Sequence, residues 1–161
     1  MNSDDLQVVM ARDLRALARE VSLYPSDEQL WRVVPGIANS GGTLARHLVG
    51  NIQHFVGAVL GGSGYVRDRE AEFGKHDLTR SQLVTEAERA LAELDRVMPT
   101  LDAARLAAEF PVELLGRRLV TARALTHFAS HFAYHLGQID YHRRVVAPES
   151  GTAGTMSLTE I

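Results

Sequence analysis

The chain has 161 residues, a formal net charge of -3 at pH 7 with histidines counted as neutral, and no cysteine. This length fits one domain that buries roughly two thirds of its unfolded surface without disulfides, and the missing cysteine excludes thiolate metal sites, iron–sulfur clusters and a cysteine nucleophile. The chain has no excess positive charge and no long basic run, which argues against nucleic acid and membrane surfaces as partners.

A first helix is predicted between Asp4 or Asp5, which can cap its start, and Pro25, which marks its end. Its apolar residues recur at helical spacing, at Leu6, Val9, Met10, Leu14, Leu17 and Val21. Charged side chains interrupt this segment, which is therefore neither a signal peptide nor a transmembrane helix. We expect a cytoplasmic protein.

The next segments alternate between connectors and helices. Residues 24–42 are rich in turn-forming residues and predict a connector, and a second helix follows from Gly42 to about Leu60. The charged segment 63–77 predicts a long exposed crossover or a short irregular helix. A capping-box pattern formed by Thr79 and Gln82 opens a third helix that runs to Pro99.

Residues 101–120 fit helical turns and extended segments equally well, so we make no prediction for them. Thr121 is expected to cap a fourth helix that runs to about Val146. Four amphipathic helices without an alternating strand pattern predict an all-α fold, a four-helix bundle. We expect one domain over residues 1-146 and a flexible tail over residues 147-161, which is rich in Gly, Ser and Thr.

Four of the seven histidines lie on the fourth helix, and three of them, at positions 127, 131 and 135, are one turn apart. At roughly 100° per residue, His135 lies about 60° from the apolar centre of this helix, His131 about 100° and His127 about 140°. His131 and His135 are one turn apart on the interior flank, a spacing at which two imidazoles can bind one transition metal ion. His76 and His142 are expected at the surface.

The second helix carries a polar strip that includes His47, Asn51 and His54 and borders the apolar stripe. If this border faces the fourth helix, His47 is the natural third ligand and His54 is the competing choice. Histidines four residues apart also occur by chance, and such a histidine often only hydrogen-bonds a backbone carbonyl or a carboxylate.

Two motifs resemble the DinB-like superfamily of four-helix bundles. One is His-Phe-Ala-Tyr-His-Leu-Gly-Gln-Ile from His131 to Ile139, and the other is Ser-Gly-Gly-Thr-Leu-Ala-Arg-His-Leu from Ser40 to Leu48. The resemblance covers roughly residues 4–146 and indicates an uncharacterised branch. It implies a long crossover between helices two and three, zinc or nickel bound by His47, His131 and His135, and a homodimer.

Three imidazole ligands leave a divalent ion with its full charge and an open coordination position. Such an ion lowers the pKa of bound water from about 15.7 to near 7, or it binds and ionises a thiol. We therefore expect a metal-dependent enzyme acting on an unknown small molecule. It would be a hydrolase or, as the resemblance suggests, a transferase that uses a low-molecular-weight thiol.

Further site residues are expected on the same elements. The candidates for catalysis are His54 and Asn51, and the candidates for substrate binding are Arg67, Arg69 and Gln138. The two arginines could equally belong to a solvated loop that pairs with Asp68, Glu70 and Glu72. The alternative function is a non-catalytic, stress-related protein that binds a metal or a ligand, for which His54 or His127 would complete a closed four-ligand site.

Overall fold

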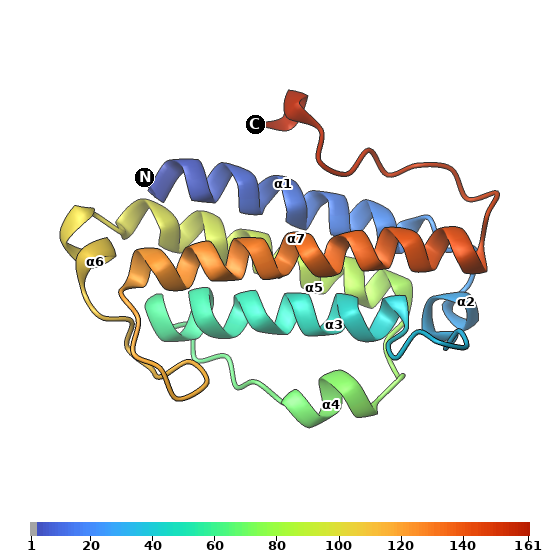
Figure 1. Cartoon of the computed structure of the whole chain (residues 1–161), viewed down its shortest axis with the longest axis horizontal. Coiled ribbons are helices and arrows are strands. Elements are labelled where there is room, and N and C mark those ends of the chain that lie inside the picture. Colours follow the sequence, from blue (N-terminus) through green and yellow to red (C-terminus); the bar gives the residue numbers. More distant parts are fainter. Residues whose placement is uncertain (1–2) are drawn as a thin grey trace.

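Four long helical segments form most of the structure, a computed structural model that describes residues 3–161 (Figure 1). They are α1 (Ser3–Ser22), α3 (Gly41–Ile52) with its continuation η1 (Gln53–Leu60), α5 (Arg80–Val97) and α7 (Thr121–Val146). Within residues 3–161, extended pairing is limited to two isolated bridges, Glu109 with Val120 and Leu114 with Arg117. The predicted all-α class is confirmed.

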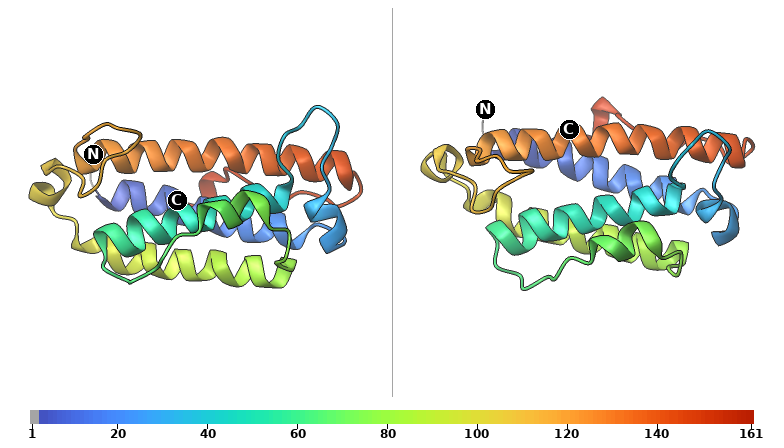
Figure 2. Two further views of the ribbon diagram at one scale, coloured as in Figure 1. Left: turned by 90° about the horizontal axis from the view of Figure 1, so that it is seen from below. Right: turned by 60° about the horizontal axis from the view of Figure 1, so that its bottom comes forward.

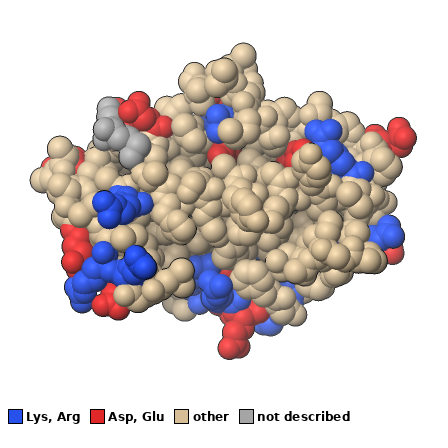
Figure 3. All heavy atoms as spheres, in the orientation of Figure 1, with Lys and Arg blue, Asp and Glu red and all other residues tan. Residues whose placement is uncertain are grey.

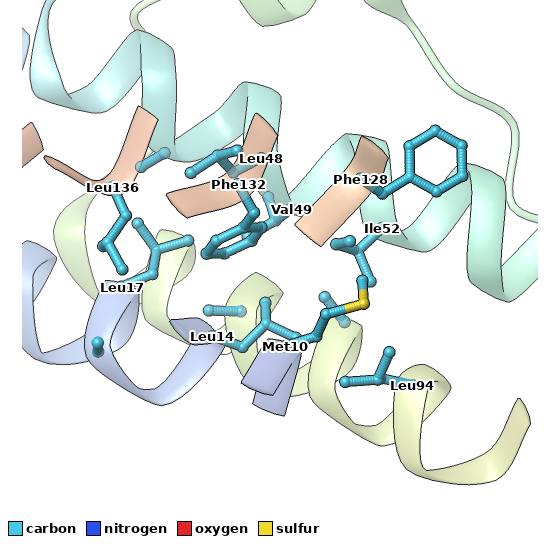
Figure 4. Packing of buried hydrophobic residues seen from close by; sticks show 14 of the residues in the cluster. Met10, Leu14, Leu17, Leu48, Val49, Ile52, Leu94, Phe128, Phe132 and Leu136 are labelled. Atoms are coloured by element: carbon cyan, nitrogen blue, oxygen red, sulfur yellow. The ribbon is translucent and has the colours of Figure 1, made fainter. Parts of the chain in front are cut away.

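The long helices enclose one apolar core. Helix α1 packs on α5 and α7, and α3 packs on the same two helices. Figure 2 accordingly shows α1 and α3 at opposite corners of the assembly. Met10, Leu14 and Leu17 of α1 meet Ile52 of α3 and Phe132 of α7 in the interior (Figure 4). Each such buried side chain contributes roughly 1.5–3 kcal/mol, so this core fixes the position of α3 relative to α7.

Shorter elements lie in the connections. They are α2 (Asp27–Trp31), α4 (Arg69–Gly74), η2 (Met98–Thr100), α6 (Ala103–Ala107) and η3 (Leu158–Glu160). The expected crossover between the second and third long helices contains α4, which packs against α3. Residues 101–120, for which the sequence allowed two interpretations, contain both a short helix and the two extended bridges.

Asp4 and Asp5, expected as caps of the first helix, instead lie in the first turn of α1, which begins at Ser3 in the described residues. The Ser40 side chain accepts a hydrogen bond from the Thr43 amide, and Thr79 and Gln82 form the predicted capping box. The expected capping role of Thr121 is wrong. Val120 holds the cap position, and the Thr121 hydroxyl instead donates to the Ala108 carbonyl at 3.1 Å, which ties the 101–120 connection to α7.

The second long helix departs from the prediction of a regular α-helix. From Gln53 to Leu60 it is wound as a π-helix, in which each residue advances by a smaller angle than the ~100° of an α-helix. Residues four apart therefore stay nearly in line along this segment, which changes the side chains that face α7.

His142 is buried, with 2 % of its surface exposed, so its expected surface position is wrong. Its Nε2–H donates to the Arg32 carbonyl at 2.8 Å, and its Nδ1 accepts from the Tyr24 hydroxyl at 2.7 Å. A side chain at Gly41 would collide with that hydroxyl. The glycine at position 41 thus leaves space for the hydrogen bond between Tyr24 and His142, which joins α7 to the connector before α3.

Residues 147–161 run back along α1 (Figure 1). Arg143, fully buried, pairs with the buried Glu20 and also donates to the Ser150 hydroxyl and the Gly151 carbonyl. Arg19 pairs with Glu160 further along the tail. The division at residue 146 stays a prediction. No helix within residues 3–161 has the length and apolar character needed to cross a membrane.

Candidate metal centre

His47, His131 and His135 form one cluster, as the sequence predicted. Helix α3 supplies His47 and helix α7 supplies the other two, and the packing of these helices brings their ligand nitrogens within 4.8 Å of one another. The Nε2 atoms of His47 and His131 are 3.3 Å apart. The rings of His131 and His135 are nearly perpendicular, with their centroids 4.5 Å apart. The cluster could hold a metal ion.

Glu72 fixes the orientation of His47. Its Oε2 lies 2.9 Å from Nδ1 of His47, and because an ionised carboxylate only accepts, Nδ1 carries the proton. The lone pair of His47 is therefore on Nε2, the nitrogen that faces His131. A histidine that donates its other N–H to a carboxylate is a recurring arrangement at metal sites.

The carboxylate of Glu72 is itself held from two sides. Arg67 donates from Nε to Oε1 at 2.6 Å and from Nη2 to Oε2 at 2.8 Å. Burial acts to raise the pKa of Glu72, but the hydrogen bonds from His47 and Arg67 outweigh it and hold this pKa below its usual range. A side chain at Gly50 would collide with Oε1 of Glu72, so α3 has a glycine where this carboxylate approaches.

Gln138 orients His135 in the same way. Its Oε1 lies 2.6 Å from Nδ1 of His135, so Nδ1 donates the hydrogen bond and Nε2 keeps the lone pair. Gln138 does not line the pocket in front of the histidines; it faces a neighbouring hollow between residues 36–39 and α7. Its expected role in substrate binding stays a prediction.

The environment favours neutral imidazoles. Burial is the main cause that lowers the pKa of His131 to about 4, and the charges of His135 and His47 add to it. Burial also lowers the pKa of His135, against the opposing hydrogen bond to Gln138. Both residues are therefore in the uncharged form that binds metal ions at neutral pH.

The cluster opens into a pocket of about 410 Å³. Its walls come from α3 and η1, the crossover, the 109–120 connection and α7. Besides the three histidines, they include Asn51, Phe55, Arg67, Arg69, Phe73, Glu113, Leu114, Leu115, His127 and Phe128. Among the predicted catalytic and substrate-binding residues, the structure thus brings Asn51, Arg67 and Arg69 together with the cluster.

His54 does not line this pocket, although its position on an ideal helix suggested that it would. The π-helix keeps Phe55 in line with Asn51 and turns His54 aside, where its ring packs on Phe55 with centroids 4.7 Å apart. Burial, followed by the charge of Arg67, lowers the pKa of His54. Within residues 3–161, neither His54 nor His127 belongs to the three-histidine cluster that could hold a metal ion.

Sequence reasoning did not identify Glu72 as a site residue. It is separated from His47 by 25 positions, and the local sequence indicates only a possible partner for the arginines of a charged loop. The one usable signal was Gly50 inside a helix, which indicates the close approach of another group.

The chain matches the model of a known protein family. The family model described as "Protein of unknown function (DUF1572)" matches residues 6–155, a range that contains the three histidines, Arg67 and Glu72. Neither the curated proteins nor the solved structures contain a significant match to the chain.

Proposed function

We propose that this chain, which belongs to the family of proteins of unknown function DUF1572, is a metal-dependent enzyme that acts on a small molecule. One observation carries the proposal. Three imidazoles with ligand nitrogens within 4.8 Å of one another border a pocket of about 410 Å³, and two of them are oriented by Glu72 and Gln138. Zinc or nickel fits a set of nitrogen ligands of this kind.

The arrangement favours catalysis over a structural role. Structural zinc sites are closed by four protein ligands, whereas this cluster has three within residues 3–161 and faces a pocket. An ion with an open position supplies Lewis-acid chemistry that lowers the pKa of water or of a thiol. The alternative function, a non-catalytic metal-binding or ligand-binding stress-related protein, lacks the fourth ligand that a stapling metal would use.

The residues of the chain have separate roles in this proposal. Glu72 and Gln138 hold the ligand imidazoles in one tautomer and one orientation. Asn51 lies on the pocket wall one turn after His47 and is the candidate to orient a substrate. His54 lies behind that wall, so a catalytic contribution would act through Phe55 or Arg67.

Metal content tests the first part of the proposal. Protein purified without chelator is analysed for bound metal, and the loaded protein is compared with His47→Ala, His131→Ala and His135→Ala. The matched control is His76→Ala, a histidine outside the cluster that stacks on Trp31. We expect each cluster variant to lose the metal with little change in melting temperature, and the control to keep it. A large fall in melting temperature with metal loss would favour stapling, and unchanged metal content would refute the site.

Cobalt substitution separates the two reaction classes. Co²⁺ binds histidine sites much as zinc does, and a thiol that binds Co²⁺ gives a sulfur-to-metal charge-transfer band. A new band on addition of dithiothreitol, absent in His47→Ala, would support the thiol-dependent transferase. Hydrolysis of 4-nitrophenyl acetate that depends on zinc and on His47, without such a band, would support the hydrolase.

Two finer structural proposals accompany this function. The packing of α1, α3, α5 and α7 and the crossover through α4 support a DinB-like four-helix bundle. The homodimer is supported by the exposed Tyr134, Tyr141 and Val145 on α7. The face of the molecule on which α7 lies also has few charged side chains at its centre (Figure 3). The small residues Gly57 and Gly61 do not support the dimer, because both pack against α5 of the same chain. Sedimentation at low micromolar concentration tests the dimer.

A further inference from the structure

We infer that the pocket binds a small organic anion with an apolar body, and that Arg69 holds its anionic group. The inference rests on the proposed function, because it names the class of substrate for the same site. It depends on three features of the pocket: one cation without an acidic partner, an aromatic wall, and an exposed leucine at the mouth.

Arg69 is the cation available to a ligand. The other arginine of the pocket, Arg67, is already bound by both oxygens of Glu72 and has 10 % of its side chain exposed. Arg69 is exposed, and within residues 3–161 no carboxylate lies in ion-pair distance of it; its guanidinium instead stacks on Phe73 at 5.4 Å. Five N–H donors in a planar fork suit a carboxylate or a phosphate group.

Phe73 connects this cation to the metal-binding cluster. Its ring lies 5.4 Å from the Arg69 guanidinium on one contact and 5.0 Å from the His47 ring on the other. One molecule could therefore contact Arg69 with one end and the histidine cluster with the other. The acidic residue on the wall, Glu113, is engaged by Arg118 at 3.3 Å, and Glu72 is neutralised by Arg67. Arg69 thus has no ion-pair partner within residues 3–161, and its guanidinium is free to bind an anion.

The remaining wall suits an apolar group. Phe55 and Phe128 stack with their centroids 4.7 Å apart and their planes 11° from parallel, and both line the pocket. Phe73 also lines the pocket and is 39 % exposed, so part of its ring is open to a ligand. A volume of about 410 Å³ fits a small molecule.

Leu115 adds apolar surface at the mouth. It lines the pocket, yet 98 % of its surface is exposed, and its backbone has φ 51° in the left-handed region that branched side chains rarely adopt. The following Gly116 has φ 73°, so the turn between the bridged residues Leu114 and Arg117 presents Leu115 at its tip. An exposed leucine in a strained turn is explained if it contacts a ligand.

The test uses full-length protein loaded with zinc and isothermal titration with three probes of similar size. These are 4-phenylbutyrate, phenethyl phosphate and the neutral 4-phenyl-1-butanol. The variants are Arg69→Gln, Arg69→Lys and the control Arg15→Gln, which removes one exposed positive charge from α1. We expect at least one anionic probe to bind more tightly than the alcohol. Arg69→Gln should weaken that binding by roughly tenfold or more, Arg69→Lys by less, and Arg15→Gln not at all. The probe that binds more tightly distinguishes a carboxylate from a phosphate.

Three results would overturn the inference: no binding of either anion at millimolar concentration, equal binding of the alcohol, or affinities unchanged by Arg69→Gln. Zinc content is measured in the same samples, and the titration is repeated with zinc removed. If the protein binds zinc but Arg69→Gln leaves the anion affinity unchanged, the substrate class is refuted and the metal-dependent function is not. If the protein binds no zinc but Arg69→Gln still weakens anion binding, the metal-dependent function is refuted and the substrate class is not.

Discussion

Glu72→Gln is expected to weaken metal binding by roughly 10–100-fold, because the amide keeps the shape of the side chain but removes the charge that holds His47. In the structure this carboxylate accepts from Nδ1 of His47 at 2.9 Å and from two nitrogens of Arg67. A hydrogen bond to a buried charged group contributes about 1.5–3 kcal/mol, which agrees with the 10–100-fold range at about 1.4 kcal/mol per tenfold.

The same substitution also removes the counter-charge of Arg67, whose side chain is 10 % exposed. We expect the free energy of unfolding to fall by about 2–4 kcal/mol as a result. Because this loss is smaller than the 5–15 kcal/mol stability typical of a domain, the variant remains folded at low temperature, where its metal affinity can be measured.

The assay is a competition titration of zinc against a chromophoric chelator, with urea unfolding measured in parallel. Glu70→Gln is the control, since it removes the same charge from the exposed side of α4. Gly50→Ala is a second route to the same result, because its methyl group would displace the Glu72 carboxylate. An affinity for Glu72→Gln within threefold of the unmodified protein would refute the reasoning. An equal loss in Glu70→Gln would show that only the overall charge matters.

Three further predictions follow from particular groups. The metal-free protein is expected to lose about 2 kcal/mol of stability as the pH falls from about 6.5 to about 4. In this pH range the unfolded chain gains a proton at His131. The folded chain does not, because its His131 has a pKa of about 4. Urea titrations of His131→Asn should show a weaker pH dependence, and an unchanged one would contradict this. Arg143→Met should cost about 3–5 kcal/mol in urea unfolding, because it leaves Glu20 buried without a partner, whereas Arg144→Met at an exposed pair should cost less than about 1 kcal/mol. Leu115→Asn should raise stability by about 0.5–1 kcal/mol by relieving the left-handed backbone and should weaken 4-phenylbutyrate binding; a stability loss in thermal unfolding would show that the turn is not strained.

The histidine cluster could be predicted from the sequence because it depends on regular geometry. His131 and His135 are one turn apart on a helix that stays regular from Thr121 to Val146, so rotation per residue assigned both to the inner flank. His47 lies in the regular part of the second long helix, before the π-helical segment begins at Gln53. The periodicity therefore held for every residue of the cluster.

The same argument failed for His54 because it lies one residue inside the π-helical segment. The prediction assumed a constant rotation per residue, and the wider winding rotated Phe55 into the pocket in its place. The residue expected on the pocket wall was His54, whose imidazole could transfer protons. The π-helical winding instead places Phe55 there, and its ring packs on Phe128.

The role of the crossover could not be predicted from local pattern, because Glu72, which Arg67 holds in place, contacts His47 across 25 positions. In the sequence, Glu72 and Arg67 look like members of a charged, solvated loop, and most neighbouring residues in that loop are indeed exposed. What distinguishes Glu72 is a glycine on another helix, since Gly50 leaves space that only an approaching group explains. A crossover that contributes the carboxylate for His47 and also carries Arg69 and Phe73 is part of the site rather than a connector. Changes in its sequence should therefore alter metal affinity and ligand choice more than they alter the helical core.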